Sequence, residues 1–127
     1  MGQLGDQTTD DRSTPVPVFG ISTATTISAG PGHACAVLIN GTVQCWGYNS
    51  YGQLGDGTTT DSSTPVSVVG ITNATSVSAA GAYSRTCAVL IWGSVQCWGR
   101  NSHGQLGDGS STDSLTPVNA VLPTCDA

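Results

Sequence analysis

Apolar and polar residues alternate along this chain in short runs of the kind that form β-strands. Residues 24–29 alternate threonine and isoleucine with small residues, residues 34–39 are apolar, and residues 42–46 are β-branched and aromatic. Residues 15–18 form a further run that begins with proline. Turn-forming residues separate the runs, and no stretch has helical spacing beyond a single turn. The pattern predicts four short antiparallel strands, with residues 15–18 first and at a sheet edge, because proline cannot donate a hydrogen bond to a neighbouring strand.

The same pattern recurs along the chain. The segment Gly-Gln-Leu-Gly-Asp begins at Gly2, Gly52 and Gly104, so its copies lie 50 and 52 residues apart. Thr-Pro-Val follows each copy, and Cys-Ala-Val-Leu and Gln-Cys-Trp-Gly occur twice in phase. Four short strands in about 50 residues is the size of one β-propeller blade.

The sequence therefore predicts an all-β fold built of propeller blades, each with four antiparallel strands. We divide it into repeat unit 1 (residues 1–51), repeat unit 2 (residues 52–103) and a partial repeat unit 3 (residues 104–127). Trp46 and Trp98 lie inside strands at the same phase and are expected to fill the core of a blade. Leu54 and Leu106 are lone apolar residues in polar loops and are expected to pack between blades.

Four of the five cysteines also recur in phase. A three-residue hairpin loop at residues 39–41 places Cys35 directly opposite Cys45, and the same count places Cys87 opposite Cys97. Directly opposed residues come close enough for a bridge, so we predict two cross-strand disulfides, each worth roughly 2–3 kcal/mol. Free thiols in a reducing compartment are the alternative, and the spacing argues against zinc. Cys125 has no partner in the repeat, so it is either free or paired with another molecule.

The motifs are similar to those of a known family. Trp-Gly, then Asn-Ser-Tyr-Gly-Gln-Leu-Gly-Asp-Gly-Thr, Thr-Pro-Val, Ser-Ala-Gly and Cys-Ala-Val-Leu resemble the regulator of chromosome condensation repeat in its bacterial, cysteine-containing variety. This resemblance covers essentially the whole chain and implies a seven-bladed propeller. It also implies an alternative function, guanine-nucleotide exchange on a small nucleotide-binding protein. The loops that carry that activity in the family match no positions of this chain.

The charge pattern excludes some classes of partner. The chain has no lysine, and its cations are Arg12, Arg85 and Arg100 against 8 carboxylates, which gives a net charge of −5. A nucleic-acid binder needs a basic stripe, so no nucleic-acid partner is expected, and binding to an anionic membrane is disfavoured for the same reason. Met1 is followed by neither a basic start nor an apolar stretch, so no secretory leader is predicted here. Low charge and abundant serine and threonine favour an extracellular or cell-surface protein, with a cytoplasmic one as the alternative.

Candidate chemistry is sparse. Asp56 with Asp61, and Asp108 with Asp113, lie in polar loops and could bind calcium, but capping of turns explains them better because the dense spacing of a calcium loop is missing. His33 and His103 occupy unrelated positions of the repeat. We therefore expect no catalytic residues, no cofactor and no metal, and a protein that is not an enzyme.

Positions that break the repeat are the better functional candidates. Trp92 replaces Asn40 at a hairpin tip, and Tyr83 and Arg85 lie at the two-residue insertion of the second copy. Aromatic residues and arginine dominate interface hot spots, so Tyr83, Arg85 and Trp92 form a candidate interaction patch. Ordinary divergence between the copies explains these residues equally well.

Two complete units and one extra strand cannot close a ring. Repeat units bury their faces only against neighbours, so the chain is expected to be part of a longer propeller, or to assemble with further copies into a ring or a filament. The last strand, at residues 117–121, is expected to complete a blade made elsewhere, in the same chain or in the next one. The predicted function is a non-enzymatic binding or scaffold module, extracellular, with a protein or carbohydrate ligand that the sequence does not identify.

Overall fold

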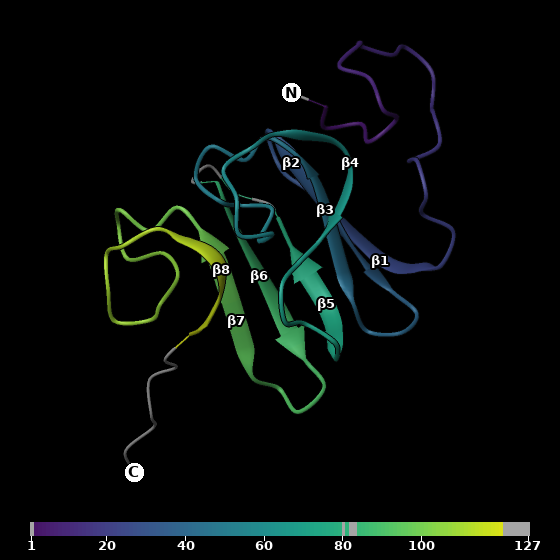
Figure 1. Ribbon diagram of the computed structural model, residues 1–127. Helices are drawn as coiled ribbons and strands as arrows, with labels where there is room; N and C mark the ends of the chain where they lie inside the picture. The colour runs from purple at the N-terminus through teal and green to yellow at the C-terminus, as the bar shows by residue number, and fades with distance from the viewer. Residues whose placement is uncertain (1, 80, 82–83, 121–127) are drawn as a thin grey trace.

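Two four-stranded antiparallel sheets lie side by side in the computed structural model of the protein, which describes residues 2–79, 81 and 84–120 (Figure 1). Each sheet is one propeller blade with its strands in chain order. The first blade contains β1 (Ala24–Ala29), β2 (His33–Leu38), β3 (Val43–Gly47) and β4 (Ser62–Ser67). The second contains β5 (Ala74–Ser78), β6 (Arg85–Leu90), β7 (Val95–Gly99) and β8 (Ser114–Asn119). The all-β propeller architecture expected from the sequence is confirmed.

The blades begin at a different point of the repeat from the one predicted. Residues 15–18 are not a strand, and the Thr-Pro-Val segment of the next copy, in β4, pairs with β3 instead. An extended segment forms a strand only beside a partner, and the described residues 2–14 contain no strand for residues 15–18 to pair with. The proline segment does lie at a sheet edge, as expected, since β4 and β8 are the outermost strands of their sheets.

The last strand completes a blade of the same chain, which is one of the two alternatives expected for it. β8 pairs with β7, so the segment at the end completes the second blade. Residues 52 and 104, where the sequence units were divided, fall between the third and fourth strands of each blade. The segment without a strand partner is therefore at the other end, at residues 2–21.

Both hairpins between the second and third strands carry a disulfide. The strand register places Cys35 opposite Cys45 and Cys87 opposite Cys97, with Cα–Cα distances of 4.0 Å in both pairs. The structure joins the cysteines in these two pairings, as the hairpin count predicts. Cys125 lies outside the described residues.

The main core lies between the two blades. The first blade contributes Cys35, Val37, Val43 and Cys45 to it, and the second blade contributes Trp98 and three alanines. Leu54 is fully buried in this cluster, which confirms its expected place between blades. Trp98 was expected inside a blade, but it packs against the connecting loop of the preceding repeat. A blade is a single four-stranded sheet without an interior of its own, so the ring is buried in the core that the two blades share.

Candidate blade-docking site

The loop at residues 52–61 is organised around one asparagine. The side chain of Asn49 has no exposed surface, and its Nδ2 donates to Asp56 Oδ1 at 3.3 Å and to the carbonyls of Thr58 and Thr60 at 3.0 Å. Its Oδ1 accepts the backbone N–H of Leu54 at 2.9 Å. The asparagine therefore ties the end of β3 to the Gly-Gln-Leu-Gly-Asp loop that follows it.

The carboxylates of this loop cap backbone groups. Asp61 Oδ1 accepts the backbone N–H of Asn49 at 2.8 Å, and Asp56 Oδ1 accepts the N–H and the hydroxyl of Thr58. In the third copy Asp113 and Asp108 make the same contacts with Asn101 and Ser110. The hydroxyl of Ser110 is the main reason that the pKa of Asp108 lies below its usual value. Among the described residues no cluster of three metal-ligating side chains occurs.

The second blade docks onto this loop through a tryptophan. The indole N–H of Trp98 donates to the carbonyl of Gln53 at 2.9 Å, and the hydroxyl of Thr86 donates to the same carbonyl at 2.7 Å. A Cβ at Gly55 would lie 2.6 Å from Trp98 Nε1, so only glycine leaves room for the ring. We call this arrangement the indole socket: a glutamine carbonyl and, two residues later, a glycine.

The first blade has the same contact with the start of the chain. The indole N–H of Trp46 donates to the carbonyl of Gln3 at 2.9 Å, and a Cβ at Gly5 would lie 2.8 Å from that ring. Val18 and Ile21 pack beside Trp46. Residues 2–21 therefore cover Trp46 of the first blade in the way that the loop at residues 52–61 covers Trp98 of the second blade. Figure 1 shows this first segment on the outer side of the first sheet.

The third socket holds no indole. It consists of Gln105 and Gly107, and a Cβ at Gly107 would meet only the side chain of Ala120, at 3.7 Å. The carbonyl of Gln105 accepts the guanidinium of Arg85, and Gln105 Nε2 is buried without a hydrogen-bond partner among the described residues. Because Trp46 and Trp98 occupy the other two sockets and Trp92 is at a hairpin tip, no tryptophan of this chain is left for it.

Comparisons with known proteins agree with this repeat geometry. The family described as "Regulator of chromosome condensation (RCC1) repeat" matches residues 1–37, 40–89 and 93–124, and a second family of the same description matches residues 24–53. The chain belongs to the RCC1 repeat family. The resemblance expected from the sequence motifs is thus confirmed.

Individual relatives are much longer than this RCC1-repeat chain. The ultraviolet-B receptor UVR8 of Arabidopsis thaliana is 36% identical over 118 residues, which cover 91% of this chain and 27% of that protein. The solved structure of human WBSCR16 superposes with a TM-score of 0.75 at 22% identity, covering 95% of this chain and 33% of the other. Yeast RCC1 (Prp20) bound to Kap60 gives 0.68 at 21% identity, covering 87% and 25%. These structures share the fold, and the chain spans about a quarter to a third of their length.

A buried polar contact lies between the two blades of this RCC1-repeat chain. His33, at the start of β2, is buried, and its Nε2 is 2.8 Å from the hydroxyl of Thr86. Because that hydroxyl donates to Gln53, it accepts from His33, which places the ring proton on Nε2. Burial lowers the pKa of His33 to about 4, so the ring is neutral at pH 7. His103 lies in the third loop, so the two histidines belong to separate sites.

The predicted interaction patch is not brought together. Arg85 begins β6 and Trp92 follows its other end, so about 20 Å of strand separates them. Arg85 is drawn to the third loop by its bond to Gln105, and Tyr83 lies outside the described residues. Trp92 is 89% exposed, and its apolar neighbours are the exposed Ile39 and Ile91, which line a groove of about 460 Å³ between the two hairpin tips. This surface could have been predicted from the repeat, because Ile39 and Ile91 occupy the same position of their hairpins.

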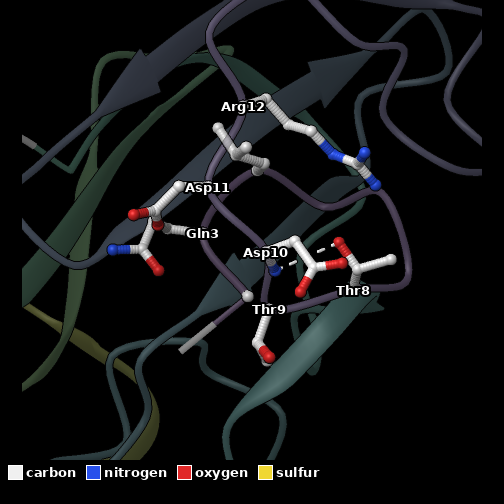
Figure 2. A pocket seen from close by; sticks show the side chains of 8 residues that line it. Gln3, Thr8, Thr9, Asp10, Asp11 and Arg12 are labelled. Carbon is white, nitrogen blue, oxygen red and sulfur yellow. Dashed lines mark hydrogen bonds between the residues drawn. The ribbon is translucent and has the colours of Figure 1, made fainter.

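A second cavity, of about 240 Å³, lies in the first loop (Figure 2). Its lining includes Gln3, Thr8 and the run Asp10, Asp11 and Arg12. Asp6 lies in the same loop and accepts Arg12 at 3.0 Å and Thr8, whose hydroxyl is the main reason that the pKa of Asp6 lies below its usual value. These contacts hold the first loop.

Proposed function

We propose that this chain is a non-enzymatic scaffold and binding module that forms part of a larger propeller. One observation carries the proposal: Trp46 and Trp98 are each buried by the loop of the preceding repeat, and the equivalent third loop buries no tryptophan of the described residues. Stacked repeats are stabilised by their neighbours, so further blades beside the third loop would add stability.

The described side chains support a role other than catalysis. His33, the one buried histidine, contacts a threonine that is already bonded to a backbone carbonyl. The loop aspartates are engaged with asparagine, serine and threonine as turn caps. Neither arrangement holds an activated nucleophile beside a base.

The surface at the hairpin tips supports a protein ligand. Ile39, Ile91 and Trp92 are 76%, 57% and 89% exposed and lie at the same end of the two blades. Exposed apolar side chains gathered at one place are typical of interaction sites. Together with the −5 charge they favour an uncharged or basic protein surface.

The two disulfides support an extracellular or cell-surface location, because such bonds persist in oxidising compartments. The described residues contain no helix that is long and apolar enough to cross a bilayer. The exchange-factor alternative stays a prediction, since the likeness to yeast Prp20 is one of fold at 17–21% identity.

A tandem fusion tests the scaffold role. Residue 120 of one copy is joined directly to residue 19 of a second, which keeps the repeat in phase because Val18, Val68 and Ala120 occupy equivalent positions. We expect the fusion to unfold in one transition at a higher Tm than the single chain. A control fusion keeps residues 2–21 in the second copy and adds a flexible linker, so that its copies are out of phase. Equal Tm values for the single chain and both fusions would contradict the proposal.

A further inference from the structure

The groove between the two hairpin tips has apolar walls that come from equivalent positions of the two blades. Ile39 directly follows β2 and Ile91 directly follows β6, and they are 76% and 57% exposed. Both line the groove of about 460 Å³, as do Val37 and Ala74, which are buried. A side chain that enters this groove therefore meets apolar surface from both four-stranded blades.

The backbone beneath the groove is held in one conformation. The N–H of Ala74 donates to the carbonyl of Gly41 at 2.9 Å, which joins the start of the second blade to the hairpin of the first. Gly41 has a φ of 84°, and a Cβ there would clash with the carbonyl oxygen of Thr72, so only glycine allows this approach. The two cross-strand disulfides brace the same two hairpins. Tips that are already ordered lose little entropy on binding, so the groove is preorganised for a ligand.

Uncharged polar side chains surround the apolar walls. Asn40 and Asn73 both line the groove and are exposed, and Asn73 comes from the start of the second blade. Asn40 Oδ1 accepts the hydroxyl of Thr42 at 2.7 Å, which fixes this amide at the edge of the groove. An apolar centre with a polar rim is the usual anatomy of a protein–protein interface.

No charged residue of the described chain lies at this end of the blades. The hairpins fall in stretches without aspartate, glutamate, lysine or arginine, at residues 13–55 and 86–99. Arg85 begins β6 and Asp61 directly precedes β4, so both lie at the strand ends opposite to the tips. Figure 1 shows the charged segment at residues 2–12 remote from the two tips. A charge on a partner would find no counter-ion here and would lose its hydration, which favours a partner without charge.

We propose that this groove receives one apolar side chain of an uncharged protein segment, with Trp92 packing along the segment beside it. This inference deepens the proposed binding function and rests on it, since it names the part of the protein ligand that makes contact. The paired isoleucines hold the side chain between the blades, and the asparagine amides bond to the backbone of the segment. Trp92, which is 89% exposed, supplies the large aromatic contact that anchors many interfaces.

The composition of the groove favours a protein segment over two other uncharged ligands. A neutral sugar would place hydroxyl groups against the aliphatic walls of Ile39 and Ile91 and leave them without hydrogen bonds. A zwitterionic lipid surface would take up the isoleucines, but it would also bury the amides of Asn40 and Asn73 in hydrocarbon. A peptide segment satisfies both parts of the groove, because it carries apolar side chains on a backbone that hydrogen-bonds.

Selection from a library of random twelve-residue peptides displayed on phage tests the inference. The target is the full chain with Cys125→Ser, so that disulfide capture is not mistaken for binding. We expect enriched peptides to share an aliphatic or aromatic residue flanked by uncharged residues. As synthetic peptides they should bind with a Kd of about 10–100 μM, which isothermal titration calorimetry measures.

Matched variants connect the selected peptides to the groove. Ile39→Ser with Ile91→Ser removes both walls and should weaken binding at least tenfold, and Trp92→Ser should weaken it several-fold. Val69→Ser is the control, because Val69 is apolar and 50% exposed but does not line the groove, and it should leave the Kd unchanged. Circular dichroism and thiol titration check that each variant keeps its fold and its two disulfides.

An isosteric change tests the charge argument by itself. Asn73→Asp adds one negative charge to the rim of the groove without changing the shape of the side chain. Selection on this variant should enrich peptides with lysine or arginine, whereas selection on the parent protein should not. The same peptide composition for both proteins would overturn the claim that the groove selects an uncharged partner.

Three results would overturn the inference as a whole: no enriched peptide, mainly charged peptides from the parent protein, or affinities that the isoleucine changes leave unaltered. Sedimentation velocity and phosphatidylcholine vesicles test the other occupants, a second copy and a lipid surface. Binding to either that depends on the isoleucines, in the absence of enriched peptides, would assign the groove to that occupant instead. The scaffold role is judged separately, because the in-phase fusion measures contacts between blades and does not involve the hairpin tips.

Discussion

The loops at residues 2–12 and 52–61 share their motif and differ in what surrounds them. The second loop is tied to β3 by Asn49 and buries Leu54 completely between two blades. The first loop leaves Leu4 38% exposed and borders a cavity of about 240 Å³. Both nevertheless bind an indole N–H through a glutamine carbonyl at 2.9 Å. The comparison teaches that the motif supplies the socket, whereas the preceding strand and the facing blade supply its stability.

The same contrast holds between the first positions of β2 and β6. His33 is buried beneath the second blade and is held neutral, whereas Arg85 at the equivalent position is exposed and reaches the backbone of the third loop. A neutral ring suits an interface that is covered, and a guanidinium suits one that is open to solvent. The covered face of the first blade, which carries His33, and the open face of the second blade, which carries Arg85, are therefore different surfaces.

The largest difference is expected from truncating the equivalent leucines. Leu54→Ala should lower the free energy of unfolding by about 3–4 kcal/mol, because it leaves a cavity between the blades. Leu4→Ala should lower it by less than about 1 kcal/mol, since that side chain is partly exposed already. Urea denaturation followed by tryptophan fluorescence measures both. Equal losses would show that the two loops are equally well packed.

The next largest effect is expected from acid, which should lower the stability of the interface between the blades. The pKa of His33 is lowered to about 4 in the folded protein, below its unfolded value of 6.5, so the unfolded state binds more protons between these values. Stability should therefore be constant above about pH 7 and fall as the pH drops from 6.5 to 4, by about 3 kcal/mol at most. Denaturation curves at several pH values measure this slope. In His33→Gln the slope over this window should be largely removed, and its persistence would assign the acid sensitivity to other groups.

Removing one disulfide at a time should destabilise the protein by a different amount for each hairpin. Each bridge is expected to contribute roughly 2–3 kcal/mol by constraining the unfolded chain. Cys35 and Cys45 are 0% exposed in the core between the blades, so Cys35→Ala with Cys45→Ala should cost more than Cys87→Ala with Cys97→Ala. Thermal unfolding of the two double variants gives the comparison. The reverse order would place the main core elsewhere.

The smallest effect should come from exchanging residues between the loops. Gln7→Gly should stabilise the protein by about 0.5 kcal/mol, because glycine adopts the left-handed backbone of this position without strain. The reciprocal change Gly57→Gln should destabilise it by about 1 kcal/mol, since the space there is open and only the backbone is strained. Differential scanning calorimetry of both variants measures these shifts. Destabilisation by Gln7→Gly would mean that the glutamine side chain holds the first loop in place.

Much of this fold could be predicted from sequence because its signals are local. The alternation of apolar and polar residues predicts the strands. The separation of ten residues between Cys35 and Cys45, around a turn that contains glycine, predicts which cysteines face each other across the hairpin. The phase of the blades could not be read in this way. A repeating pattern has no intrinsic start, so residues 15–18 and 62–67 look alike although only the latter has a strand beside it.

The contacts of the site depend on tertiary structure and were harder to foresee. Trp98 was expected within its own blade, but the carbonyl that binds it lies 45 residues earlier in the chain. Arg85 and Trp92 were grouped because both lie where the repeat is broken and both are residue types common at interfaces, but a strand separates them. The sequence did contain a usable signal, since Asn49 and Asn101 recur in phase before the second and third Gly-Gln-Leu-Gly-Asp segments.

Hydrogen exchange of the leucine amides in the three loops is the most direct test of the account. The N–H groups of Leu54 and Leu106 are bonded to buried asparagine side chains at 2.9 Å and both side chains are buried, whereas Leu4 is 38% exposed. We predict slow exchange for Leu54 and Leu106 and exchange at least tenfold faster for Leu4. Equal protection of all three amides would contradict the claim that neighbouring strands and blades give these loops their stability.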